Sequence, residues 1–134
     1  MKITNRAKQV GIDPAKFIVI GSGVLDALGI RSTDDIDMLV TKDVYESFLS
    51  KPGWTEKIWP QGDPTLSTDG VELCTDWGDD KNIYQFDDIL QNSITVEGIR
   101  FVSPEFLIKW KNNKGREKDL KDVVLIKKYL AKSS

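Results

Sequence analysis

The 134-residue chain carries 19 basic and 21 acidic residues, no histidine and a single cysteine. Its length predicts one domain, residues 1–134, and its 40% hydrophobic and 30% charged residues predict a soluble protein with an ordinary core. The missing histidines exclude Ser-His-Asp and Cys-His catalysis and histidine metal sites, and the lone cysteine excludes an internal disulfide and a cysteine zinc cluster.

Neither a membrane span nor a secretion signal is expected. No apolar run approaches the roughly 20 residues that cross a bilayer. The first residues, Met1–Arg6, lack the long apolar stretch of a signal peptide. We therefore expect a cytoplasmic protein that makes no contact with a membrane.

The first half of the chain predicts alternating helices and strands. Apolar, β-branched runs indicate buried strands, and apolar residues at helical spacing indicate helices. Gly29 would end one short helix, and Thr41 would cap another. In chain order, the expected elements are a helix over 2–10, a new element from Pro14, a strand over 16–20, a turn at 21–23, a helix over 24–28, a strand over 35–40 and a helix over 42–49.

The second half predicts a hairpin and two C-terminal helices. Ser103 and Pro104 form a strong helix start, because Ser caps a helix and Pro suits its first position. The last helix is expected to have its apolar residues on one side: Leu120, Val123, Val124 and Leu130. The expected elements are an irregular or hairpin region over 54–69, a strand over 71–75, a short helix within 82–90, a hairpin of 94–96 and 99–102, a helix from 103 that breaks at 112–115, and a helix over 116–130. Together the two halves predict an α/β (α+β) fold.

Charge is unevenly distributed along the chain. Residues 63–97 hold nine acidic residues and one basic residue, whereas residues 109–134 hold nine basic and three acidic residues. Such blocks are typical of two solvated faces, and charge alone favours this interpretation. The alternative is an acidic wall that binds a cation, facing a basic wall that holds phosphates.

Asp35 and Asp37 form the first half of a candidate site. Residues two apart on a strand share a face, so these carboxylates would project side by side while Ile36 and Met38 enter the core. A cation relieves their repulsion, and oxygen-only ligands in a phosphate-handling setting suit Mg²⁺ or Mn²⁺. Two such ions can clamp the attacking and leaving oxygens of an in-line displacement.

Gly21 and Ser22 supply the second half. Without a Cβ, Gly21 would let a phosphate approach the backbone, and the Ser22 hydroxyl can donate to a phosphate oxygen. Ser22 would also begin a helix whose free N–H groups and positive end favour anions. The order strand, turn, helix, strand would bring this turn close to the carboxylate pair.

A third carboxylate usually completes a two-metal site. Glu72 is the best candidate, because Val71 and Leu73 flank it on a predicted strand and it would face the cleft. Asp76 shares that face if the strand continues, which makes it the reserve candidate. Each feature alone also fits an ordinary turn, a solvated strand end or an exposed strand residue, so the prediction depends on their combination.

These residues resemble the signature of the nucleotidyltransferase superfamily, which has the polymerase-β-like fold. The matching residues are Gly21-Ser22, after an apolar residue, and Asp35-Ile36-Asp37-Met38. The stretch Leu28–Asp37 looks like a small bacterial branch that contains toxin-type enzymes of abortive-infection and toxin–antitoxin systems. The tail is similar to the ending of that branch, in Lys111, Gly115-Arg116, Lys118-Asp119 and Asp122.

The resemblance implies a minimal nucleotidyltransferase fold, a mixed β-sheet flanked by helices with a helical C-terminus. It implies that Asp35 and Asp37 bind the metals. Glu72 would ligate metal or activate the attacking hydroxyl, and Gly21 and Ser22 would hold the terminal phosphates of the nucleotide.

The basic tail has two interpretations. By the resemblance, Lys111, Arg116 and Lys118 contact phosphate or a partner, and a solvated basic helix is the alternative. Asp119 would orient Arg116 or Lys118 through a salt bridge.

The implied activity is transfer of NMP from an NTP to a hydroxyl of an acceptor, with loss of pyrophosphate. RNA such as tRNA, a small molecule or a protein side chain would fit as acceptor, although the net charge of −2 argues against broad nucleic-acid affinity. An antitoxin or a second subunit is the expected partner. One alternative is a nucleotide-binding or protein-interaction module without transfer activity. Glu72 favours this alternative, because the superfamily commonly has Asp at that place. The other alternative is a structural protein whose carboxylates do not converge.

Overall fold

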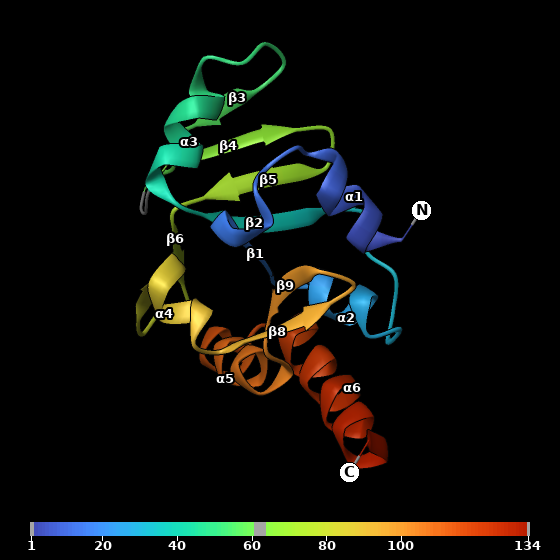
Figure 1. Ribbon diagram of the computed structural model, residues 1–134. Coiled ribbons are helices and arrows are strands. Elements are labelled where there is room, and N and C mark those ends of the chain that lie inside the picture. Colours follow the sequence, from blue (N-terminus) through green and yellow to red (C-terminus); the bar gives the residue numbers. More distant parts are fainter. Residues whose placement is uncertain (1, 61–63, 134) are drawn as a thin grey trace.

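The computed structural model describes residues 2–60 and 64–133, which form two β-sheets and a set of helices (Figure 1). The strands are β1 (Phe17–Ile20), β2 (Ile36–Val40), β3 (Thr55–Lys57), β4 (Thr65–Thr68), β5 (Val71–Cys74), β6 (Asp76–Gly78), β7 (Ile83–Gln85), β8 (Ser93–Val96) and β9 (Ile99–Val102). The helices are α1 (Ile3–Gln9), the 3₁₀ turn η1 (Pro14–Lys16), α2 (Gly23–Ala27), α3 (Lys42–Leu49), α4 (Phe86–Leu90), α5 (Pro104–Lys114) and α6 (Glu117–Ser133). The predicted α/β fold is therefore confirmed.

The most apolar strands form the centre of the sheet. The large sheet has seven strands in the order β3-β4-β5-β2-β1-β9-β8, and β6 and β7 pair separately. β1 is buried along its whole length, since β2 and β9 flank it and α2 and α4 contact it. β2 and β5 run parallel, and this register places Asp37 opposite Glu72. The predicted site residues of these two strands thus lie at the middle of the sheet.

The short helix predicted within residues 82–90 is present as α4, over Phe86–Leu90. The residues just before it, Ile83–Gln85, form strand β7, which pairs with β6. The helix starts only at Phe86, where Gln85 and Asp88 form a capping box. Strand β5 ends at Cys74, so Asp76 belongs to the small sheet and does not continue the face of Glu72.

The region 54–69 contains the two antiparallel strands β3 and β4, as the hairpin interpretation predicted. Its residues 61–63, including Gly62, lie outside the described part of the chain. β3 forms one edge of the sheet.

The C-terminal helices lie side by side at one end of the molecule (Figure 1). The Ser103 hydroxyl accepts a hydrogen bond from the Phe106 N–H, and Gly115, with φ of 67°, ends α5. Both the predicted start and the predicted break are confirmed. Within the described residues, no helix is long and apolar enough to cross a membrane.

The apolar side of α6 is buried only in part, at Val123. Leu120 and Val124 are 47% and 53% exposed. The buried face instead includes two acids, and its members are Asp119, Asp122, Val123 and Ile126. Acids occupy this face because cations from other elements neutralise them there, as described below.

Gly23 offers a test of packing beneath the candidate site. A Cβ at Gly23 would lie 2.7 Å from Val19 Cγ1 and 3.0 Å from Ile3 Cδ1, and both neighbours are buried. We expect Gly23→Ala to lower the free energy of unfolding by about 1–3 kcal/mol, because the core must shift to admit the methyl group. Urea unfolding measures the change.

Gly78→Ala is the matched control, since a Cβ at Gly78 would meet its neighbours at 3.6 and 3.8 Å, which is ordinary contact. It should change stability by no more than about 0.5 kcal/mol. Equal losses in the two variants would contradict the tight packing at Gly23.

Candidate functional site

Three carboxylates lie where β2 and β5 run side by side. Asp35 directly precedes β2, Asp37 is its second residue, and Glu72 is the register partner of Asp37. Ile36 and Met38 are fully buried, as predicted, so Asp37 points to the opposite face of the sheet. Burial, followed by the charges of Glu72 and Asp35, raises the pKa of Asp37 to about 6.

These carboxylates have no neutralising partner within the described part of the chain. No lysine or arginine there forms an ion pair with Asp35, Asp37 or Glu72. Burial raises the pKa of Glu72, and the charge of Asp35 raises it too, while Lys57 lowers it. The group therefore has unbalanced negative charge at neutral pH.

The raised pKa of Asp37 predicts a pH dependence of stability. Its pKa is about 6 in the folded protein and 3.8 in the unfolded chain, so protonation of Asp37 favours folding. This stabilisation is fully present below pH 3.8 and is lost as pH rises through about 6. It amounts to about 3 kcal/mol.

Urea unfolding of the protein and of Asp37→Asn between about pH 4 and pH 8 tests this expectation. The variant should gain stability relative to the parent protein as pH rises through about 6. Glu46→Gln, on the exposed surface of α3, is the control and should follow the parent protein at every pH. A stability difference between Asp37→Asn and the parent protein that is independent of pH would contradict the raised pKa.

A cavity of about 380 Å³ opens beside Asp37. Six of the predicted site residues line it, although they come from the turn after β1, from β2 and from the C-terminal helices: Gly21, Ser22, Asp37, Lys111, Arg116 and Lys118. Asp35 and Glu72 lie outside its lining. The reserve candidate Asp76 also lies outside it, and its carboxylate accepts a hydrogen bond of 2.9 Å from Gln85 Nε2.

The Gly21-Ser22 turn packs directly against Asp37. Gly21 has φ of 67°, which favours glycine, and a Cβ there would lie 3.5 Å from Asp37 Oδ2. Ser22 precedes α2 without capping it by a side-chain hydrogen bond. Because α2 has only five residues, its dipole contributes little, and an anion would depend on the turn backbone and the Ser22 hydroxyl.

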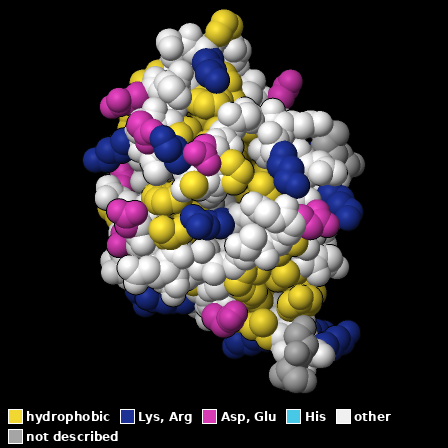
Figure 2. Space-filling model, in the orientation of Figure 1, with side chains coloured by type: hydrophobic (Ala, Val, Ile, Leu, Met, Phe, Trp, Pro, Cys, Tyr) yellow, Lys and Arg dark blue, Asp and Glu magenta, His cyan; other side chains and the backbone are white. Residues whose placement is uncertain are grey.

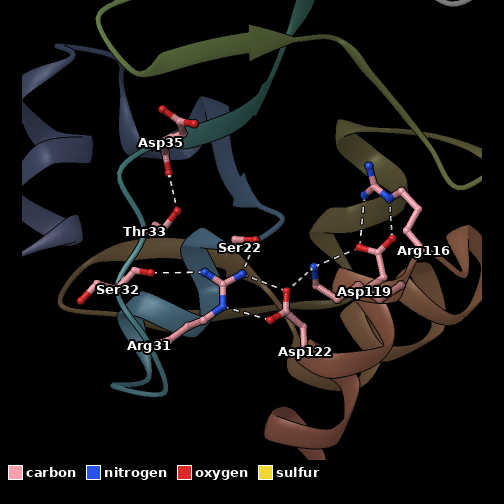
Figure 3. Close-up of polar contacts among 9 residues, drawn as sticks. Ser22, Arg31, Ser32, Thr33, Asp35, Arg116, Asp119 and Asp122 are labelled. Carbon is pink, nitrogen blue, oxygen red and sulfur yellow. Dashed lines mark hydrogen bonds and ion pairs between the residues drawn. The ribbon is translucent and has the colours of Figure 1, made fainter.

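A buried ion network forms the other side of the cavity. Lys111 Nζ lies 3.0 Å from Asp122 Oδ2 and 3.5 Å from Asp119 Oδ1, and all three side chains are at least nine-tenths buried. Arg116 binds Asp119 through two hydrogen bonds of 2.5 and 3.1 Å (Figure 3). The predicted pairing of Asp119 with Arg116 is therefore present, and Lys111 is not a solvated residue. Lys118, by contrast, is exposed.

Asp119 and Asp122 remain ionised in spite of their burial. Burial alone would raise their pKa values, but hydrogen bonds and charges from Arg116 and Lys111 lower the pKa of Asp119. Hydrogen bonds from Arg31 and Lys111 lower the pKa of Asp122 in the same way. The network thus consists of charged groups at neutral pH.

Some residues of the cavity were not predicted as site residues. Arg31 belongs to the stretch that carries the family resemblance, but its spacing alone gave it no role. Trp77 and Trp110 also line the cavity, with ring centroids 4.7 Å apart and planes inclined at 16°. The Trp110 Nε1–H is buried and has no hydrogen-bond acceptor among the described residues. In the sequence, a tryptophan that lines a cavity looks the same as a tryptophan of the ordinary core, so these two could not be predicted as site residues.

The donor set fits a metal held jointly with a substrate. Within residues 2–60 and 64–133, no group of three acidic or cysteine side chains is arranged to hold a metal ion by itself. Mg²⁺ usually binds through one or two carboxylates and completes its ligands with water and substrate phosphates. Asp37 lines a cavity that also has cations, and Asp35 lies two positions before it in the chain, which matches that mode of binding.

Comparisons of the chain with protein-family models, with curated proteins and with solved structures gave no match. The function must therefore be argued from the residues of the site.

Proposed function

We propose that the protein is a metal-dependent nucleotidyltransferase that moves NMP from an NTP to a hydroxyl group of an acceptor. The observation that carries the proposal is the single cavity in which Gly21, Ser22 and Asp37 lie together with Lys111 and Arg116 of the C-terminal region. Carboxylates next to hydrogen-bond donors and cations suit a polyphosphate that arrives with its metal ion.

The carboxylates supply the acidic half of the chemistry. Asp35 and Asp37 would hold Mg²⁺ or Mn²⁺, which when bound offsets phosphate charge and lowers the pKa of the acceptor hydroxyl. Glu72 adds an oxygen ligand or accepts the proton of that hydroxyl. Burial raises its pKa, which makes the carboxylate a better proton acceptor.

The turn and the C-terminal helices supply the phosphate-binding half. The backbone at Gly21 and the hydroxyl of Ser22 hold the terminal phosphates. The acceptor oxygen forms a bond to the α-phosphorus as the bond to the β-phosphate oxygen breaks, and pyrophosphate leaves with both electrons of that bond. Cations around the cavity stabilise the charge that develops on the leaving group.

The ion network has positive charge in excess. Three cations, Arg31, Lys111 and Arg116, share the two carboxylates of Asp119 and Asp122. One positive charge is therefore left over for an anionic ligand. A preorganised charge of this kind supports binding of a polyphosphate without rearrangement of the network.

Calorimetric titration of each NTP with and without Mg²⁺, followed by a labelled-NTP assay, tests the proposal. The acceptors offered are total RNA, small hydroxylated compounds and proteins. We expect Mg²⁺-dependent binding of at least one NTP and label on one class of acceptor. The absence of binding for every NTP would overturn the proposal.

A nucleotide-binding module without transfer activity is the second candidate function. The lack of a self-sufficient metal-binding group among the described residues favours it. In the same experiment, Mg²⁺-dependent binding with no label on any acceptor would identify the module.

A further inference from the structure

Arg31 connects the Gly21-Ser22 turn to the last helix. It lies between α2 and β2, and its Nε and Nη2 donate to the two carboxylate oxygens of Asp122, each at 2.9 Å. Nη2 also donates to Ser22 Oγ at 3.0 Å, and Nη1 donates to the Ser32 carbonyl at 3.2 Å (Figure 3). One planar guanidinium thus bonds three other residues at once.

The carboxylate of Asp122 fixes the orientation of this guanidinium. Asp122 is 5% exposed and is also paired with the buried Lys111 at 3.0 Å. A bidentate pair with an immobile carboxylate leaves the guanidinium plane little freedom to turn. The Nη2–H that reaches Ser22 is therefore held in place by α6.

The bond from Arg31 decides how the Ser22 hydroxyl can act. Ser22 Oγ accepts from Arg31, so its own hydrogen remains available as a donor. Within the described part of the chain this hydroxyl does not cap α2, and Ser22 lines the cavity beside Asp37. An accepted bond on one lone pair restricts the rotation of the hydroxyl and leaves its hydrogen directed elsewhere.

We propose that Arg31 is a positioning residue, which uses its pair with Asp122 to hold the Ser22 hydroxyl ready to donate to a polyphosphate. The inference rests on the proposed function, because it takes Ser22 as a phosphate-binding residue. It makes Asp122 of the last helix part of the phosphate site through Arg31.

A double-mutant cycle on Ser22 and Arg31 tests the inference. The probe is inorganic tripolyphosphate with Mg²⁺, followed by calorimetry, and the variants are Ser22→Ala, Arg31→Lys and their combination. Lysine keeps the charge but lacks the planar fork that reaches both partners. We expect each single variant to bind about tenfold more weakly, and the double variant to bind no more weakly than either, since both remove the same hydrogen bond.

Other outcomes separate the inference from its premise. Full affinity in Arg31→Lys would show that only charge matters at this position, and multiplied losses in the double variant would show that Arg31 acts apart from Ser22. Either result would overturn the inference while leaving the proposed function intact. If the parent protein binds neither tripolyphosphate nor any NTP, both fail.

Controls cover folding and catalysis. Arg100→Lys, on β9 and outside the cavity lining, should bind like the parent protein. Ser22→Ala removes only a hydroxyl, so its melting temperature is expected to stay unchanged. This variant therefore tests the site even if Arg31→Lys is less stable. In the transfer reaction, the KM for NTP should rise about tenfold in Arg31→Lys with kcat within about twofold, which a general loss of structure would not produce.

Discussion

Asp37→Asn is expected to lower NMP transfer by at least about a thousandfold while the protein remains folded and becomes more stable at neutral pH. The amide has nearly the shape of the carboxylate but cannot supply a charged ligand to a metal. Stability should rise because Asp37 is buried beside Glu72 and Asp35, and this environment disfavours its charge. Transfer of labelled NMP and urea unfolding, measured on the same preparation, give the two results.

The two opposite effects distinguish a functional carboxylate from a structural one. A structural carboxylate would lose stability when replaced, and a residue without a role would change neither quantity. Glu46→Gln, an exposed acid on α3, is the matched control and should retain both activity and stability. Transfer at the parental rate in both Asp37→Asn and Asp35→Asn would show that the proposed site is wrong.

Local signals in the sequence predicted the frame of the candidate site. Short apolar runs predicted the strands over Phe17–Ile20 and Ile36–Val40. Gly21 predicted the turn between them, and its φ of 67° is one that favours glycine. Ser103 and Pro104 marked the start of α5 for similarly local reasons. Such signals depend on neighbours within a few residues, so one sequence suffices to find them.

The interior of the cavity could not be predicted in this way. Asp119 and Asp122 are buried because Lys111, Arg116 and Arg31 neutralise them, and Arg31 lies 91 positions from Asp122 in the chain. The apolar residues predicted on one side of α6 coincide with its buried face at Val123 alone. Leu120, Val124 and Leu125 are exposed, and Figure 2 shows hydrophobic side chains on the surface toward the α6 end of the molecule.

The two halves of the proposed site differ in the same way, since one is built from neighbouring elements and the other from distant parts of the chain. The carboxylates and the turn come from consecutive elements, β1, α2 and β2, and β5 adds Glu72 by pairing with β2. The basic half comes from the last two helices, and tertiary packing alone brings it to the turn. The proposed function therefore depends on the network that joins them, and the contribution of its central lysine to stability can be measured.

Lys111→Met is expected to lower the free energy of unfolding by about 3 kcal/mol. Lys111 is the only member of the network whose cation is itself buried, with its side chain 4% exposed between Asp119 and Asp122. The arginines that would remain are 46% and 38% exposed, so they neutralise the inner oxygens of the two carboxylates less completely. Lys114→Met is the control on the same helix, because Lys114 pairs with Asp80 at the surface and its loss should change stability by less than about 1 kcal/mol. Urea unfolding of both variants measures this. Equal losses would mean that the buried pairs of Lys111 do not stabilise the packing of α5 on α6. A selective loss in Lys111→Met, together with weaker tripolyphosphate binding, would show that ligand binding depends on the same network.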